Sequence, residues 1–222
     1  MCNLTTARKS ADEVAAYFRA KVPGAFNVAA ETYPGTPGMV VIENEGVREL
    51  RSMVWGFPLI LKAMRENAEK RGVQPRPKPV NNVADLSRPM WRGIAAKPQW
   101  RCLIPITAFA EAEGPKGAMT RTWFSMKSEP LFAWGGFWRQ SVEWGDVYTG
   151  LMTCANEAIQ PVHDRMPVLL HAHEHDAWLH GSIDDVIAFQ DRKFPPELCA
   201  IERTSELWVK RKGVAEAVPM LL

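Results

Sequence analysis

The sequence predicts a mixed α+β fold, mainly antiparallel, in which a barrel-like curled sheet is flanked by helices. Short runs rich in β-branched and aromatic residues recur through 39–57 and 99–156, with turn residues between them. Helical patterns stand near both ends of the chain. No long linker or internal repeat divides the 222 residues, so we expect a single domain over 1–222.

Capping residues and apolar spacing predict the helices. Ser10 and Glu13 form a capping box at the start of a helical pattern over 10–22. A second pattern ends at Gly72, a residue that commonly follows the last turn of a helix. Together with the helix over 10–22, the sequence predicts helices over 59–72, 173–181 and 182–193.

The strands are predicted from apolar runs bounded by turn residues. Residues 39–57 predict two strands around a turn at Glu45–Gly46. We expect a strand and turn over 99–114, and a strand or mixed segment at the end of the chain, 197–208. Successive strands of an antiparallel meander are predicted at 121–127, 131–140 and 146–156, and loops rich in glycine or proline at 23–38 and 73–83.

The composition is that of a globular protein. Hydrophobic residues make up 46% of the chain and charged residues 23%, and the net charge is +2. A charge so close to neutral restricts any nucleic-acid site to a local basic patch. Because no apolar run has the length of a membrane span and no signal-peptide core follows Met1, we expect a cytoplasmic protein that does not bind membranes.

Four cysteines are too widely spaced for a zinc ribbon, and a reducing cytosol would keep them as free thiols. Cys102 and Cys154 lie in apolar runs, where a cysteine usually acts as a small buried hydrophobe. Cys2 lies in no such run and directly follows Met1. Removal of Met1 would give Cys2 a free α-amine next to its thiol, a pair that no internal cysteine offers.

Three further stretches contain candidate site residues, and each has two interpretations. His163 lies between prolines in the loop 161–167. It could belong to a rigid functional site, or it could cap a turn in a loop whose charged residues form ordinary ion pairs. Glu111 follows an apolar strand. Its carboxyl could be a charge at the rim of the sheet, or it could lie in a desolvated pocket that raises its pKa. Asn81 and Asn82 precede a predicted turn, which asparagine often caps.

Seven segments are together more specific than any of them alone. In chain order they are MCN, VWGFP, NNVADLSRPMWRG, RCLIPITAFAEAEG, FAWGGFW, MTCAN and VHDRMP. With cysteine at position 2, this order resembles the SRAP family, the SOS-response-associated peptidases that also cross-link to abasic sites in DNA. The resemblance extends from the first residues to about residue 179.

The resemblance implies that Cys2, freed by removal of Met1, is the nucleophile of a catalytic set with Asn82, Glu111 and His163. Its amine would form an imine with the ring-opened abasic sugar, and its thiol would close a thiazolidine ring. Glu111 would move the amine proton, His163 would act as an acid for the sugar oxygen, and Asn82 would orient the intermediates. The same set implies autoproteolytic removal of Met1 and weak abasic-site lyase activity by β-elimination.

The implied partner is single-stranded DNA with an abasic site, because an unpaired sugar is reachable without base flipping. The chain departs from the family at Leu4 and Ala84, where arginines would hold phosphate. Most of the nine tryptophans should lie in the core, but Trp55 is predicted to be exposed at a strand end. The residues expected to contact DNA are Trp55, Arg88, Met90, Trp91, Arg92 and Arg165.

Neither a metal nor a cofactor is expected. His171 and His175 have a spacing that zinc can use, but no further ligand pattern completes a site. We expect a monomer that associates with the nucleoid when it is bound to damaged DNA.

Two other classes of function stay open. An N-terminal-nucleophile cysteine amidase or peptidase would also use Cys2, and a deep closed pocket would favour it. A diverged, non-covalent module that binds single-stranded DNA would be favoured by a basic groove beside a buried Cys2.

Overall fold

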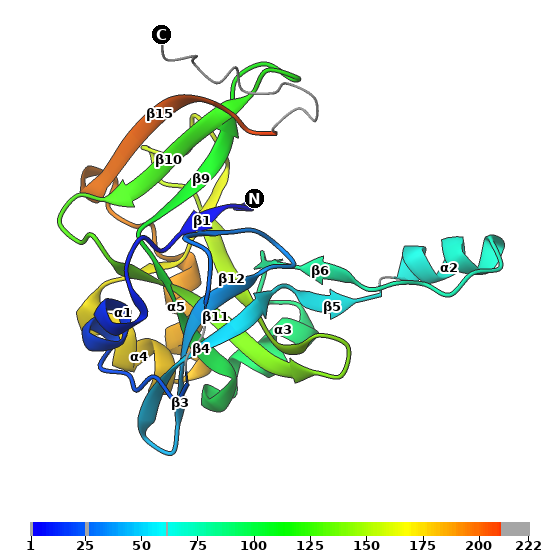
Figure 1. The fold of residues 1–222 in the computed structure, drawn as a ribbon, viewed down its shortest axis with the longest axis horizontal. Helices are drawn as coiled ribbons and strands as arrows, with labels where there is room; N and C mark the ends of the chain where they lie inside the picture. The colour runs from blue at the N-terminus through cyan, green and yellow to red at the C-terminus, as the bar shows by residue number, and fades with distance from the viewer. Residues whose placement is uncertain (1, 25–26, 61, 210–222) are drawn as a thin grey trace, which may run out of the picture.

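The computed structural model describes residues 2–24, 27–60 and 62–209. Figure 1 shows the elements along the chain. The α-helices are α1 (Ala11–Phe18), α2 (Lys62–Lys70), α3 (Pro89–Ala95), α4 (His175–His180) and α5 (Ile183–Asp191). Short 3-10 helices span Pro98–Trp100, Ala172–Glu174 and Pro196–Leu198. The strands are β1 (Thr5–Thr6), β2 (Glu31–Thr32), β3 (Pro37–Asn44), β4 (Val47–Trp55), β5 (Phe57–Leu59), β6 (Lys78–Val80), β7 (Asn82–Val83), β8 (Arg101–Ile106), β9 (Ala108–Glu113), β10 (Thr120–Met126), β11 (Phe132–Ser141), β12 (Gly145–Cys154), β13 (Arg165–Pro167), β14 (Leu169–Leu170) and β15 (Cys199–Leu207).

The larger sheet closes on itself. Strand β12 pairs with both β4 and β11, which completes a ring through β3 and β8. The contact between β12 and β4 is parallel, and the other pairs of the ring are antiparallel. The predicted fold class, a mainly antiparallel α+β fold with a barrel-like curled sheet and flanking helices, is therefore confirmed.

The barrel strands are buried on both faces. Side chains that point inward, such as those of Ile104, Trp134 and Tyr148, form one buried cluster. Those on the outer face pack in a second cluster under helices α1, α3, α4 and α5. The interior is tight at Gly150, where an added Cβ would lie 1.9 Å from the Trp134 ring.

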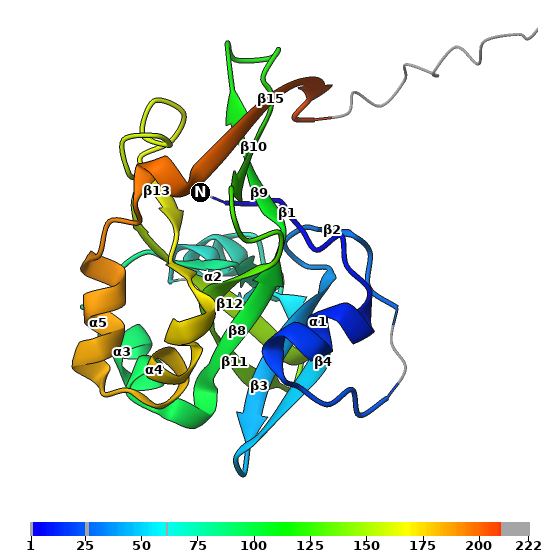
Figure 2. The same cartoon turned by 90° about the vertical axis from the view of Figure 1, so that its left-hand side faces the viewer.

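A second sheet, in the order β15-β10-β9-β1-β2, lies above the barrel in Figure 2. The predicted meander is therefore wrong at its first strand, because β10 pairs with β9 and β15 and not with β11. The tight β9–β10 connection, with Gly114 and Gly117 at positive φ, holds β10 in this second sheet. Cys154 is exposed at the end of β12, and the expectation that it is buried is wrong.

Local signals place the other elements, with some shifts. The capping box of Ser10 and Glu13 is present, but α1 ends at Phe18, where Arg19 adopts a left-handed conformation. The predicted loops are partly strand, because β2 lies within 23–38 and β6 and β7 lie within 73–83. Within the described ranges, no helix is long and apolar enough to cross a membrane.

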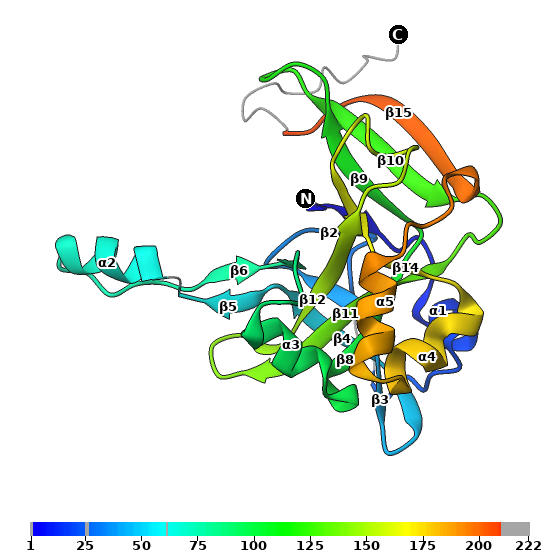
Figure 3. The same cartoon turned by 180° about the vertical axis from the view of Figure 1, so that it is seen from behind.

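Strands β5 and β6 form a separate antiparallel ribbon, with Phe57 opposite Val80 and Leu59 opposite Lys78. Helix α2 stands at the far end of this ribbon, away from both sheets (Figures 1 and 3). Ala68 is the buried residue of α2. The ribbon and helix thus project from the barrel as an arm, and β6 leads directly into Asn81 and β7.

Candidate functional site

Cys2 lies at the mouth of the barrel, between the two sheets. Its side chain has no exposed surface and packs in one cluster with Trp55 and Tyr148 of the barrel and Phe109 of the second sheet. Strand β1 fixes this position because it pairs with β9 and β2. Burial, reinforced by the nearby Glu111 carboxyl, raises the pKa of the Cys2 thiol well above its usual range. The thiol is therefore protonated at neutral pH and needs a base in order to react.

Two asparagine side chains converge on the backbone beside this thiol. The amide of Asn82 donates to the Cys2 carbonyl at 2.7 Å, and that of Asn81 donates to the same oxygen at 3.2 Å. Asn81 also donates to the side chain of Asn3 at 2.8 Å. Asn82 is 7% exposed, and its Oδ1 atom is buried with no hydrogen-bond partner among the described residues. This oxygen is placed to accept a hydrogen bond from a bound group.

Trp55 supports this pair from inside the barrel. It is fully buried, so the expectation of an exposed stacking edge is wrong. Its position in β4 points inward, as does that of Met53 two residues earlier. The indole nitrogen donates to the backbone carbonyl of Asn81 at 2.9 Å, and the ring stacks on Tyr148. Trp55 therefore positions the asparagines and does not face solvent.

Glu111 occupies a desolvated pocket, the second of the two interpretations of its sequence. The residue is 3% exposed. Burial, with a smaller contribution from the charge of Asp164, raises the pKa of its carboxyl to about 7. Near neutral pH both protonation states are populated, which suits a group that accepts and returns protons. Phe109, two residues earlier on the same face of β9, packs in one cluster with Cys2, which directs Glu111 toward the same part of the barrel mouth.

His163 lies in the loop between β12 and β13. Its Nδ1 accepts a hydrogen bond from the backbone N–H of Arg165 at 3.0 Å and lies 3.0 Å from the Asp164 carboxylate. Burial lowers the pKa of the imidazole, so the neutral form prevails at pH 7. Because Nδ1 is the acceptor, the neutral ring carries its proton on Nε2. Ile159 and Val162 of this loop pack in the same cluster as Cys2, which places the loop beside the same pocket.

A buried asparagine that sequence reasoning missed anchors the His163 loop. Asn156 accepts from two backbone N–H groups of the loop and donates to the carbonyl of Phe194 at 2.8 Å. Its position after an apolar strand, in the segment MTCAN, was the available signal. Asn156 therefore acts as an internal cap that holds the loop against the barrel.

The two positions that depart from the family pattern are used inside the protein. Leu4 is buried beside Ala110 and Trp123. The Ala84 backbone carbonyl accepts a hydrogen bond from Arg165, which also donates to the Met152 carbonyl at 3.4 Å. Arg165 thereby joins β13 to the segment that follows Asn82, and its guanidinium is engaged with the backbone.

The remaining predicted contact residues lie at the N-cap of α3 and in its first turn. Arg88, Met90 and Arg92 are exposed. Trp91 is 5% exposed and packs on Phe57 of the arm, with ring centroids 5.7 Å apart. Its apolar surface fills the space between α3 and β5, and the expectation that it is available to a base is wrong. The exposed basic face of α3 therefore lies beside the base of the arm.

An open pocket of about 470 Å³ adjoins the asparagine pair; its lining residues are Asn3, Leu4, Tyr33, Pro34, Lys78, Pro79, Asn81 and Trp208. Sequence reasoning missed the aromatic walls of this pocket. Tyr33 stands in a segment read as loop, and Trp208 lies beyond β15, where no motif marked it.

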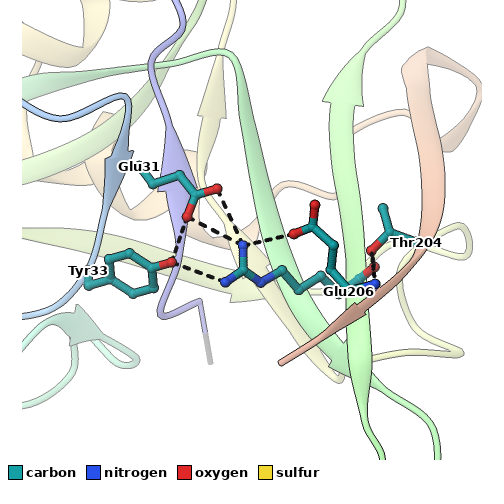
Figure 4. Close-up of polar contacts among 5 residues, drawn as sticks. Glu31, Tyr33, Thr204 and Glu206 are labelled. Atoms are coloured by element: carbon teal, nitrogen blue, oxygen red, sulfur yellow. Dashed lines mark hydrogen bonds and ion pairs between the residues drawn. The ribbon is translucent and has the colours of Figure 1, made fainter. Parts of the chain in front are cut away.

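A buried arginine holds the tyrosine wall of this pocket (Figure 4). Arg121 donates to the Tyr33 hydroxyl at 3.3 Å, to Glu31 at 3.3 Å and to Glu206 at 3.2 Å. The Tyr33 hydroxyl in turn donates to Glu31 at 2.6 Å. These contacts tie the segments around β2 and β15 to β10. Because the guanidinium is buried and multiply bonded, the pocket wall is held rigidly.

The histidine-rich segment 171–180 is engaged in other contacts. His171 lies 2.6 Å from Glu129, and His180 lies 2.6 Å from Glu43. His175 is buried and stacks on a ring of α1. Among residues 2–24, 27–60 and 62–209, no group of three or more potential ligands gathers that could hold a metal ion.

The fold and the site define a class: an α+β protein whose closed barrel holds a buried cysteine of the N-terminal segment at its mouth, near a buried carboxyl. The model of one family, described as SOS response associated peptidase (SRAP), matches residues 1–202, and the chain belongs to that family. No curated protein matches the chain significantly.

Solved structures share the fold. A protein from Bordetella bronchiseptica is 22% identical with a TM-score of 0.74, and the match covers 91% of this chain and 99% of that chain. A protein from Bacteroides thetaiotaomicron is 17% identical with a TM-score of 0.71 and covers 91% of each chain. A phage-related protein from Bordetella bronchiseptica is 16% identical with a TM-score of 0.65, covering 91% and 94% of the two chains.

Proposed function

We propose that this protein is a covalent sensor of abasic sites in single-stranded DNA. Family membership supports a function in the SOS response. The observation that carries the finer proposal is the hydrogen bond of the Asn82 amide to the Cys2 carbonyl, at the mouth of the barrel where Glu111 of β9 is also buried. Cys2, after removal of Met1, has the amine and the thiol that together trap an aldehyde.

The trapping reaction balances without an oxidant or reductant. The amine of Cys2 adds to the aldehyde carbon of the ring-opened sugar, and loss of water leaves an imine. The sulfur then bonds to the imine carbon while the thiol proton passes to the nitrogen, which closes the thiazolidine. Glu111, whose pKa is about 7, takes and returns the proton that these steps move, and His163 donates to the sugar oxygen. Asn82 orients the intermediate through its carbonyl oxygen.

The same groups account for the two accompanying activities of the proposal. Attack of the Cys2 thiol on the Met1 carbonyl gives a thioester, and water then releases methionine and leaves the free amine. The imine also acidifies the neighbouring C–H bond of the sugar. Loss of that proton expels the 3′ phosphate by β-elimination, a weak lyase activity that competes with ring closure.

The pocket beside the asparagines is the proposed seat of a nucleotide next to the abasic sugar. Tyr33 and Trp208 supply aromatic surface for a base, and Lys78 supplies a cation for phosphate. Trp55 and Trp91, which are buried, are not part of this contact surface. Arg88 and Arg92 extend it along α3.

Intact mass spectrometry of denatured samples tests the proposal. The protein, with and without Met1, is mixed with an oligonucleotide carrying one abasic site. We expect a stable adduct from the form that lacks Met1. Cys2→Ala should give an imine that only borohydride preserves, and Glu111→Gln should slow adduct formation by about 100-fold or more. Glu113→Gln, two residues along the same strand, is the matched control and should react like the wild type.

A non-covalent module for single-stranded DNA is the second candidate, because Cys2 is buried and its thiol pKa is raised. It predicts no adduct from the processed protein, and equal affinity of wild type and Cys2→Ala for undamaged single strands. If the processed protein forms no adduct but releases product from small amides in a Cys2-dependent way, the protein is an N-terminal-nucleophile amidase.

A further inference from the structure

The arm formed by β5, α2 and β6 has a charge that sets it apart from the rest of the chain. Residues 59–80 contain six lysines and arginines and two glutamates, a net charge of +4. Since the whole chain carries +2, the remaining residues carry −2. The chain therefore concentrates its positive charge on a projecting segment. A basic patch of this kind is the usual electrostatic mark of a polyanion site.

The basic side chains of the arm are open to solvent. Lys62, Arg65, Arg71 and Arg76 are all exposed. Lys62 makes one loose ion pair with Glu66 at 3.8 Å, in which the lysine side chain stays 92% exposed. A pair this exposed contributes little and leaves the lysine accessible to a partner.

The arm begins at the candidate site. Strand β6 ends at Val80, the residue before Asn81, and Lys78 of the same strand lines the pocket beside the asparagines. At the other face of the ribbon, Phe57 packs on Trp91 of α3, between the exposed Arg88 and Arg92. Positive charge thus continues from the pocket to the tip of the arm.

We propose that this arm binds the phosphate backbone of the nucleic acid whose abasic sugar reaches Cys2. The inference rests on the function proposed above, and it adds a second binding site outside the reactive pocket. Charge complementarity selects a polyanion, and the continuity of Lys78 with the pocket selects the strand already bound there.

The length of the arm sets the expected footprint. A strand of three residues spans about 10 Å, and a helix of nine residues spans about 13 Å. Figure 1 shows the ribbon and the helix extending in the same direction, so the arm reaches about 23 Å from the barrel. At about 3.4 Å per nucleotide of a stacked strand, it covers about seven nucleotides.

The test compares two triple variants for binding to an undamaged, labelled single strand of about 24 nucleotides, a length that exceeds the footprint estimated from the nucleotide rise. One variant carries Arg65→Gln, Arg71→Gln and Arg76→Gln on the arm. The matched control carries Arg19→Gln, Lys21→Gln and Lys127→Gln, exposed residues near α1 and the end of β10, on the opposite side in Figure 1. Fluorescence anisotropy is measured over a salt series, and urea unfolding checks that both variants are folded.

We expect the arm variant to bind roughly tenfold more weakly or worse at 0.1 M salt, and its slope of log K against log salt to be shallower by about 2, since each phosphate contact contributes about 0.7. The control should stay within about twofold of wild type, because its charges lie away from the bound strand. Equal slopes for the two variants would overturn the proposal. The partner of the arm would then be a second copy of this chain or an acidic protein.

The experiments distinguish failure of the sensor proposal from failure of the arm proposal. A trapping assay with an abasic oligonucleotide of about five nucleotides, shorter than the footprint, reads the chemistry without the arm. An adduct with no effect of the arm variant on binding supports the sensor and overturns the arm. Arm-dependent binding with no adduct supports the arm and removes the sensor.

Discussion

The buried carboxyl of Glu111 makes the stability of this protein depend on pH in a specific way. Burial raises the pKa of this group from 4.5 to about 7 in the folded protein. Between these values the unfolded chain has lost the proton while the folded protein keeps it. Folding therefore takes up a proton in this window, and the stability of the wild type falls as the pH rises. Glu111→Gln, a neutral side chain of the same size, removes this dependence.

The size of the effect follows from the two pKa values. The interval from 4.5 to about 7, at about 1.4 kcal/mol for each pH unit, corresponds to about 3 kcal/mol. Below pH 4.5 both side chains are neutral, and the two proteins should be equally stable. Above pH 7 the wild type has to bury a charge, so Glu111→Gln should be more stable by about 3 kcal/mol.

Urea unfolding at several pH values from 4.5 to 8 measures this difference directly. Glu113→Gln is the control with the opposite sign, because the hydrogen bond from Thr122 lowers the pKa of Glu113. Glu113 therefore stabilises the protein at neutral pH and loses that effect as the pH falls. A difference between wild type and Glu111→Gln that stays constant across the series would refute the reasoning.

Three further variants test other contacts of the site and the barrel. Asn82→Ala removes a 2.7 Å hydrogen bond to the N-terminal segment and should cost about 1–3 kcal/mol in urea unfolding while slowing adduct formation. Trp55→Phe leaves the Asn81 carbonyl with only the 3.2 Å hydrogen bond from the Gly150 N–H and should cost about 1 kcal/mol, with no loss of affinity for undamaged DNA in anisotropy. Gly150→Ala would place a Cβ 1.9 Å from the Trp134 ring and should lower stability by about 3 kcal/mol, seen as a lower thermal midpoint.

Signals from neighbouring residues predicted where helices and turns lie, but they did not predict which strands pair. The capping box of Ser10 and the turn at Glu45–Gly46 depend on a few neighbouring residues, and both are present in the structure. The partner of β10 depends on β15, more than seventy residues away along the chain, and alternation of apolar residues reveals the faces of a strand and not its neighbour. The sequence therefore could not separate the two sheets.

The sequence singled out the reactive residues of the candidate site, but it did not reveal which tryptophans are buried. The amide of Asn82 contacts the Cys2 carbonyl and Glu111 is buried in β9, while the catalytic roles that the family resemblance implies for them stay predictions. The prediction for Trp55 was wrong because an indole ring can stack on a nucleotide base or pack in the core, and the core accepts it when its N–H finds a hydrogen-bond acceptor. That acceptor, the carbonyl of Asn81, lies 26 residues further along the chain and has no local signature.

Trp55 and Arg165, both expected to contact DNA, instead hold the two ends of one short segment. Their N–H groups donate to the carbonyls of Asn81 and Ala84, on either side of Asn82. The amide that contacts the candidate nucleophile is thus fixed from both flanks. On the proposed function, a change at either donor should slow adduct formation before it weakens DNA binding. The proposed affinity for a polyanion then has to come from groups that are free of such internal contacts. The exposed cations of the arm, joined to the same segment through β6, are placed to supply it.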